Sequence, residues 1–403
     1  MEQFPDEILL KIAGELTAEE LLDTMQAGPR LRRVFSDRSL WESGSFKFPY
    51  FRDRVPSAQK AIIELFGHHF RTLELVFNAG GLDAQMFHTL SFTASFVQLN
   101  HLAVTLKDSA VPCRGRLIKT SGFQVVLDVL KKASQLKSLT ITHWPTSLLG
   151  FDNCGVPVPQ NLCPSLVVLD VRLLNTTMLG TPSSADVVTF ISNFHSFKHL
   201  KVKGGMLGEE LIHTLAAEGR LESLTVHIDS YSRAPPLVSG EAWNTLTSEL
   251  PQLDVQLFLT VNTKSCPFHD LSAYFLRPEA PVVKVSINAY AMPDVQTILR
   301  CLAAYSKTLK SVRFVEHHKK EMHPGRLRHI FTQLRDFMST LSGKHALQKI
   351  VFEGCVEHFD PMQSHFDHVI PEPLYTAIQK RKVYWIHCSD RKTLLTGTRF
   401  EWS

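Results

Sequence analysis

The chain has 403 residues, of which 44% are hydrophobic and 20% charged, a composition typical of globular proteins. It is too long to form a single compact core of the usual size. Its 43 basic and 39 acidic residues give a net charge of +4 and are interspersed, which argues against nucleic acid as a partner. The seven cysteines include no Cys-x-x-Cys pair, so we expect reduced thiols and no cofactor.

The first residues, Met-Glu-Gln-Phe-Pro-Asp-Glu, are acidic where a secretory signal would be basic. No apolar run approaches the roughly 18 residues that a membrane span needs. We therefore expect a soluble protein of the cytoplasm, the nucleus or both, which does not bind membranes.

A short amphipathic helix is expected to begin near Pro5. Asp6 follows where the positive end of the helix dipole favours a carboxylate. The apolar residues that follow fall on one face of this helix. They are Ile8, Leu9, Ile12 and Leu16.

Three further helical turns are expected before residue 45. Residues 17–20, Thr-Ala-Glu-Glu, form a capping box that starts a second helix, in which Leu21 is apolar. Residues 28–29, Gly-Pro, end that helix, and residues 30–35 form a third. A capped final turn then carries Trp41.

The segment from Phe4-Pro-Asp-Glu-Ile-Leu9 to Ser36-Asp-Arg-Ser-Leu-Trp41 resembles the F-box, whose pattern opens Leu-Pro-x-Glu-Ile-Leu and closes near Ser-Asp-x-Ser-Leu-Trp. It departs from the family at Leu31, where a tryptophan is usual. The resemblance implies a small all-α module over residues 1–45 that docks on the Skp adaptor of a cullin-RING ubiquitin ligase. The residues that it assigns to this contact are Pro5, Ile8, Leu9, Ile12, Leu16, Leu21, Leu31 and Trp41. The alternative is that these helices only cap a repeat array.

A joining segment over residues 46–68, with a helix from Ser57 to Phe66, precedes a recurrent pattern: apolar, two variable residues, apolar, one variable residue, apolar. Six of the nine intervals between successive starts measure 29 to 31 residues. The ten starts are Phe70, Leu99, Leu136, Leu166, Phe197, Leu221, Leu250, Ala280, Leu309 and Leu347. The pattern alternates like a strand at its end.

Leucine fills seven of the ten first positions and seven of the ten second positions, and the pattern resembles a leucine-rich repeat. Helix-compatible stretches lie between the strands, so an α/β solenoid with one strand and one helix per repeat is expected over residues 69–403. A last strand at residues 383–386 would close it as a C-terminal cap. The expected helices are 123–133, 185–194, 209–217, 294–305 and 327–341. A doubly wound sheet is the alternative, although no Gly-x-Gly-x-x-Gly turn follows an early strand.

Stacked parallel strands turn their leucines inward and expose the intervening residues on a continuous face, where we expect a protein substrate to bind. Arg172, Lys201 and Lys203 would form a basic spot suited to an acidic or phosphorylated segment. His227, Lys284 and Arg313 are further candidates on the same face. The alternative is a plainly solvated face, because Asp170 and Asp254 lie nearby.

The sequence contains few residue patterns that indicate catalysis or metal binding. Cys355, His358, His365 and His368 offer four potential metal ligands, but their spacing fits no standard zinc finger and a loop is the alternative. The pair at 68–69, His-His, is expected to point in two directions and to form no acid-base couple. No nucleophile elbow, phosphate loop or His-Glu-x-x-His occurs.

The resemblance to the F-box and to leucine-rich repeats together implies a non-catalytic substrate-recognition subunit of a Skp-cullin-F-box ubiquitin ligase. The F-box would bind the Skp adaptor and, through it, the cullin and RING subunits, while the repeats hold a protein substrate. A repeat scaffold without a ligase is the second hypothesis, and an enzyme of doubly wound fold is the third.

Overall fold

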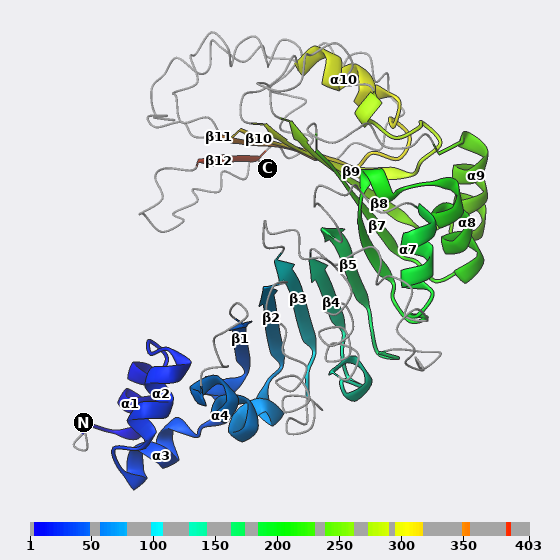
Figure 1. The fold of residues 1–403 in the computed structure, drawn as a ribbon. Helices are drawn as coiled ribbons and strands as arrows, with labels where there is room; N and C mark the ends of the chain where they lie inside the picture. The colour runs from blue at the N-terminus through cyan, green and yellow to red at the C-terminus, as the bar shows by residue number, and fades with distance from the viewer. Residues whose placement is uncertain are drawn as a thin grey trace, which may run out of the picture. The chain divides into compact units, whose positions relative to one another are not determined.

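The computed structural model describes a chain with helices and parallel strands in alternation along much of its length (Figure 1). The chain divides into two compact units, residues 1–200 and 201–403. The described residues are 4–48, 57–78, 98–107, 129–142, 163–173, 184–229, 238–261, 273–289, 295–316, 349–354 and 384–387.

The described helices and strands follow the order expected for a helical module ahead of repeats. The α-helices are α1 Asp6–Ala13, α2 Ala18–Met25, α3 Pro29–Phe35, α4 Ser57–Phe66, α7 Ser184–Ile191, α8 Glu209–Glu218, α9 Gly240–Glu249 and α10 Val295–Ala303. The 3-10 turns are η1 Arg38–Trp41, η2 Gly67–His69 and η5 Gly204–Met206. The strands are β1 Ser43–Phe48, β2 Thr72–Asn78, β3 His101–Lys107, β4 Ser138–Thr142, β5 Val168–Leu173, β6 His199–Lys203, β7 Ser223–Asp229, β8 Asp254–Val261, β9 Val282–Ala289, β10 Ser311–Glu316, β11 Lys349–Gly354 and β12 Tyr384–His387.

Local sequence signals fix the ends of the N-terminal helices. The predicted capping box is present: the Glu20 amide donates to Thr17 Oγ1, and the Thr17 amide donates to the Glu20 carboxylate at 2.8 Å. Pro29 occupies the first turn of α3, where its missing N–H costs nothing. Asp6 binds Arg30 at 2.7 Å and Arg33 at 2.9 Å, so α1 is tied to α3.

The helical module joins the repeats without a break. Trp41, only 2% exposed, donates its indole N–H to the Phe35 carbonyl and stacks on Phe66 of α4. One residue later, the Glu42 carbonyl accepts the amides of both Arg71 and Thr72. The Arg71 carbonyl accepts two amides of the next repeat in the same way, and this arrangement recurs at Asn100, Lys137 and Val167. The end of the module is therefore the first member of the repeat's own hydrogen-bond ladder.

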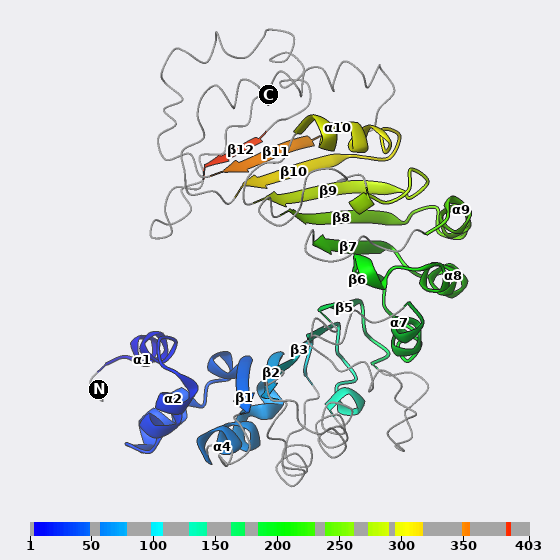
Figure 2. The same ribbon diagram turned by 45° about the horizontal axis from the view of Figure 1, so that its top comes forward.

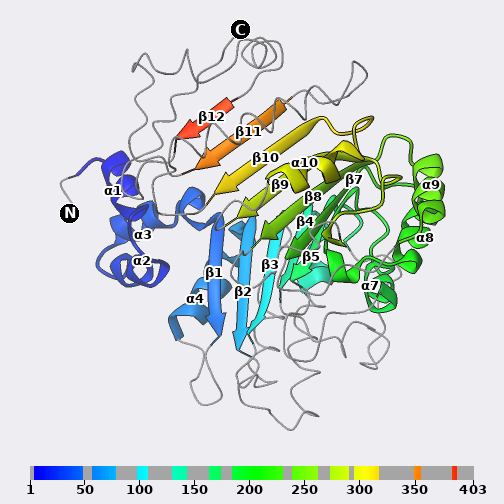
Figure 3. The ribbon, with the colours of Figure 1, turned by 90° about the horizontal axis from the view of Figure 1, so that it is seen from above.

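In the first unit, strands β1 to β5 pair in chain order and all run parallel, as the arrows of β1 to β3 show in Figure 3. Leu73, Leu102, Leu139 and Leu169 lie opposite one another in successive strands, each at most 2% exposed. These are the predicted second positions of four repeats. The predicted stacking of the repeats is thus confirmed here.

In the second unit, strands β7 to β12 also pair in chain order, and the pairings from β7 to β8 through β12 are parallel (Figure 2). The predicted phase of the pattern is wrong at two repeats, because Leu224 pairs with Val255 rather than Leu253, and Val312 pairs with Val285 rather than Val283. A strand has a side-chain period of two, so a two-residue shift keeps the same kind of residue inward. The register of β8 and β9 also shifts beyond Val255.

The core lies on the inward side of these strands. All nine predicted first positions in the described residues are buried, from Phe70 to Leu309, while Leu347 lies outside them. Helices α4, α7, α8 and α10 confirm four predicted helices, with ends shifted by a few residues in the last three. Helix α9, which the prediction did not name, packs beside α8 and buries Trp243 (Figure 2). The predicted helix 327–341 lies outside the described residues, as does most of 123–133.

The described strands show no reversal of strand order within either unit. A doubly wound sheet needs such a reversal, because its ligand crevice forms at the switch point. Both units therefore have the strand order of a stacked repeat rather than that of the alternative fold. The predicted closing strand at 383–386 is present as β12, which pairs with β11.

Candidate functional site

An exposed apolar stripe runs along α1. Phe4 is 47% exposed and Ile8 39% exposed, and Pro5 is exposed between them. Ile12 and Leu16 continue the stripe as half-buried residues. Ile8 and Ile12 are spaced four residues apart, so they share one side of α1, and Phe4 lies just before that helix. Phe4 and Ile8 are two of the three large hydrophobic residues that are exposed in the described chain.

The other half of the predicted adaptor contact is in the core, which corrects the prediction for four residues. Leu9 is 0% exposed, and Leu21, Leu31 and Trp41 are at most 5% exposed. Leu9, Leu21 and Leu31 are buried in the helical module, because three short helices must bury an apolar face against one another to be stable, and Trp41 is buried against Phe66 of α4. A partner could reach these four side chains only if the module opened. The accessible part of the predicted contact is Pro5, Ile8, Ile12 and Leu16.

Phe4, which is not among the predicted contact residues, extends this stripe. The signal was present, because Phe4 stands four residues before Ile8 and takes the place of the leucine that opens the family pattern. It was treated as part of the motif and not as a surface residue. Its backbone is held by α3, since Arg30 Nη2 donates to the Phe4 carbonyl at 2.7 Å.

On the outward strand face of the first unit, Arg172 forms an ion pair with Asp170. The Nε and Nη2 of Arg172 both donate hydrogen bonds to the Asp170 carboxylate, and Nη2 lies 2.7 Å from Oδ2. Asp170 is 4% exposed and Arg172 is one-third exposed, so this pair is shielded from water on one side. Arg172 was predicted to bind an acidic ligand, but in this structure its guanidinium is used by its own strand.

In the second unit, Lys203 is in a similar position. Its Nζ lies 3.6 Å from Asp229 Oδ2 of the neighbouring repeat, and its side chain is only 12% exposed. Lys201, the third member of the predicted basic spot, is partly exposed. Two of the three predicted cations are thus paired with aspartates, which lowers the attraction that this spot exerts on an anion.

Further along the face, two of the remaining candidates, His227 and Lys284, lie close to an aromatic side chain that was not predicted. His227 of β7 stacks on Phe258 of β8, with ring centroids 4.7 Å apart and planes 7° from parallel. Lys284 of β9 places its Nζ 5.8 Å from the Phe258 ring centroid. Arg313 of β10 is partly buried on the same side of the sheet. Phe258 is the next outward residue after Gln256, so reading one more alternate position would have found it.

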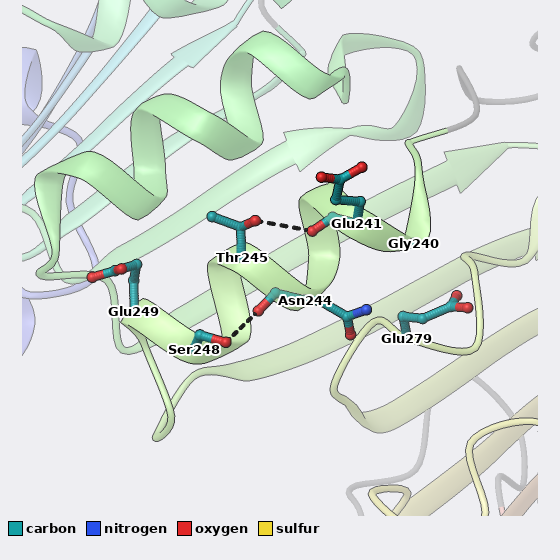
Figure 4. A pocket seen from close by; sticks show the side chains of 7 residues that line it. All are labelled: Gly240, Glu241, Asn244, Thr245, Ser248, Glu249 and Glu279. Carbon is teal, nitrogen blue, oxygen red and sulfur yellow. Dashed lines mark hydrogen bonds between the residues drawn. The ribbon is translucent and has the colours of Figure 1, made fainter.

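A groove of about 550 Å³ lies along α9, lined by Gly240, Glu241, Asn244, Thr245, Ser248, Glu249 and Glu279 (Figure 4). The Thr245 and Ser248 hydroxyls donate to carbonyls of their own helix, as the dashed lines show. Glu279 lies against Gly240 so closely that a Cβ there would be 2.8 Å from the Glu279 Cδ. This groove is an acidic helix surface whose hydroxyls are already used.

The described residues give little support to catalysis or metal binding by histidine and cysteine. His68 and His69 do not point apart as predicted: their rings are 3.8 Å apart, because they lie on a 3-10 turn and not on a regular helix or strand. Burial, and then the neighbouring His68 and Arg38, lower the pKa of His69. The described residues hold no cluster of three potential metal ligands. Cys355, His358, His365 and His368 lie outside the described residues.

Comparison with known proteins assigns no family. No protein-family description matches the sequence, and no curated protein matches it. Among solved structures, the crystal structure of a TLR13-ssRNA13 complex matches with 13% identity and a TM-score of 0.33. The match covers 79% of this chain and 43% of the TLR13 chain, so the chain spans less than half of that neighbour. Similarity at this level assigns neither a fold nor a ligand. No helix in the described part of the chain is long and apolar enough to cross a membrane.

Proposed function

We propose that this chain is the substrate-recognition subunit of a Skp-cullin-F-box ubiquitin ligase, built from an F-box and leucine-rich repeats. The observation that carries the proposal is the apolar stripe of Phe4, Pro5, Ile8, Ile12 and Leu16 along and beside α1, of which Phe4, Pro5 and Ile8 are exposed. It lies within the segment whose sequence resembles the F-box. Large apolar side chains at this exposure, grouped on one helix, are typical of a protein contact.

The junction at Trp41 supports a positional mechanism. A recognition subunit acts by holding its substrate near the ubiquitin-carrying enzyme, which raises the effective concentration of the substrate's lysines. A flexible connection between the helical module and the repeats would lower this effective concentration. Here the ladder that begins at the Glu42 carbonyl ties the helical module to the first repeats, with Arg71 Nε also 3.4 Å from Glu42 Oε1. Catalysis would belong to the RING subunit and its partner enzyme, so this chain would not be an enzyme.

The test is co-purification of the full chain with the Skp adaptor. The variant Ile8→Asp with Ile12→Asp places two charges on the exposed stripe and should abolish binding while the chain stays folded. Leu65→Asp is the matched control, because Leu65 is a 53% exposed leucine on α4, away from the stripe. Equal adaptor binding by both variants would overturn the proposed docking surface.

A scaffold without a ligase remains the second candidate function. In that case helices α1, α2 and α3 only cap the repeats, and the intact chain would not bind the adaptor at all. The same co-purification separates the two functions. The strand order within each unit weighs against the third hypothesis, an enzyme of doubly wound fold.

A further inference from the structure

Two histidine side chains lie together where the helical module meets the repeats. His68 and His69, here called the histidine pair, occupy the 3-10 turn η2, and their ring centroids are 3.8 Å apart. This turn directly follows Phe66, which stacks on Trp41, and it packs against the 3-10 turn η1. Two residues later, the chain makes the hydrogen bonds to the Glu42 carbonyl that begin the repeat ladder. The histidine pair therefore stands between the two contacts that join the module to the first repeats.

A cation of η1 acts on this pair. Burial is the largest cause that lowers the pKa of His69, and the charges of His68 and Arg38 lower it further. The Arg38 guanidinium is itself part of the junction, because its Nη2 donates to Gln98 Oε1 at 2.7 Å. Gln98 stands directly before Leu99, where the second repeat begins. A positive charge on His69 would therefore repel the residue that makes this contact.

The carboxylates on the elements around the histidine pair are used elsewhere. The Glu42 carboxylate lies 3.4 Å from Arg71 Nε and 3.8 Å from Arg38 Nε. Asp37 accepts hydrogen bonds from an amide and a hydroxyl of its own turn. Glu64, four residues before the first histidine on α4, has an interaction of its own. In the part of the chain that the structure describes, neither histidine forms an ion pair with a carboxylate, so no such contact would stabilise their charged forms.

We propose that the histidine pair makes the junction between the helical module and the repeats acid-sensitive. Around neutral pH the two uncharged imidazoles pack against each other, and η2 holds η1 in place. Protonation of both rings sets two like charges beside Arg38, with the ring centroids 3.8 Å apart, and this repulsion weakens the contact between η1 and η2. This inference does not rest on the proposed function, because it concerns only the join between two parts of the first unit.

The direction of the pH dependence follows from His69. Its pKa in the folded chain lies below the usual 6.5, so folding favours the neutral ring. The stability that results is present above the unfolded pKa of 6.5 and is lost as the pH falls through the lower, folded pKa. The pKa of Asp6, which pairs with α3, lies below 3.8, so the two contacts respond in separate pH ranges.

Hydrogen exchange of the full chain, followed by mass spectrometry at about pH 7 and about pH 5, tests the proposal. Exchange times are scaled for the slower chemical exchange in acid. Peptides that contain the Arg71 and Thr72 amides should lose protection at the lower pH, whereas peptides from α9 in the second unit should not. In the variant His68→Gln with His69→Gln, the same two amides should keep their protection. No loss in the original chain, or the same loss in this variant, would overturn the proposal.

Two single variants show whether the effect belongs to this pair. His213→Gln is the matched control, because it removes an exposed histidine of α8 in the second unit, and its junction should lose protection in acid as the original chain does. His68→Gln removes one of the two charges at an exposed position and should recover part of the protection, which keeps the test decisive if the double variant does not fold. Acid resistance of the junction in His213→Gln, or none in His68→Gln, would overturn the assignment to the histidine pair.

Discussion

Trp41 lies flat on Phe66, with ring centroids 3.9 Å apart and planes 8° from parallel. Trp41 ends the segment that resembles the F-box, and Phe66 ends the helix that leads into the first described repeat strand, β2. The stack is buried, with Trp41 at 2% and Phe66 at 6% exposure. The two parts of the first unit therefore share one hydrophobic core, and the stability of the helical module depends on the repeats.

The first prediction concerns this stack. Trp41→Ala should lower the free energy of unfolding of the first unit by about 3–5 kcal/mol, because a large buried ring leaves a cavity. Trp41→Phe should cost less, about 1–3 kcal/mol, since it retains a ring but leaves the Phe35 carbonyl without its indole donor. Denaturant unfolding followed by circular dichroism measures both. A loss of less than about 1 kcal/mol for Trp41→Ala would mean that the stack does not hold the junction.

The second prediction uses two neighbours in the chain. Ile8→Asp changes a 39% exposed residue and should leave the melting temperature almost unchanged, whereas Leu9→Asp buries a charge at a 0% exposed position and should unfold the helical module. Thermal melting of the two variants shows the difference before any binding is measured. If Ile8→Asp melts as early as Leu9→Asp, the stripe belongs to the core and cannot serve as a docking surface.

Ile8 and Leu9 also show what the hydrophobic pattern could not predict. The periodicity of α1 predicted the helix and its apolar residues, and the capping box predicted the start of α2. However, Ile8 and Leu9 are adjacent members of one wide apolar arc, and hydrophobicity alone does not say which side of the arc meets the core. That depends on how α3 packs, which Arg30 and Asp6 fix through a contact 24 residues apart in sequence.

The repeats show a second limit of prediction from the sequence, which concerns the pairing of strands. The alternation of apolar residues predicted which side chains turn inward, and the buried strands confirm it. The same alternation could not fix the phase of β8 against β7 or of β10 against β9, because a shift by two residues changes no hydrophobic match. Likewise, Asp170 and Arg172 were both expected to face outward, but only the structure shows that they bind each other.

The third prediction is a pH dependence at the α1–α3 contact. The hydrogen bond from Arg30 is the largest cause that holds the pKa of Asp6 below its usual 3.8. The pair therefore stabilises the fold above the unfolded pKa of Asp6, and its contribution is lost as the pH falls through the lower, folded pKa. Asp6→Asn should melt earlier than the original chain at neutral pH, and the gap should close in acid.

Melting curves between neutral pH and about pH 3 measure this gap. Arg30→Gln removes the first of the two partners of Asp6 and should reproduce part of the profile, because Arg33 still contacts Asp6 at 2.9 Å. A gap that stays constant over this range would show that Asp6 contributes through packing and not through its charge.

The fourth prediction concerns Cys163, a buried residue with a left-handed φ of 55°. Its thiol donates to the Leu130 carbonyl, and burial raises the pKa from 9.0 to about 12. The thiolate is the reactive form, so this shift reduces its population about a thousandfold at a given pH. Cys301, which is partly exposed, should therefore be alkylated by iodoacetamide well before Cys163 in the folded chain.

Mass spectrometry of peptides after timed alkylation at about pH 8 gives the two rates. In concentrated guanidinium chloride the rates should converge, because unfolding removes the burial that protects Cys163. Rapid labelling of Cys163 without denaturant would show that the packing around Cys163 opens readily, and that the core of the first unit is less closed at this repeat than its burial indicates.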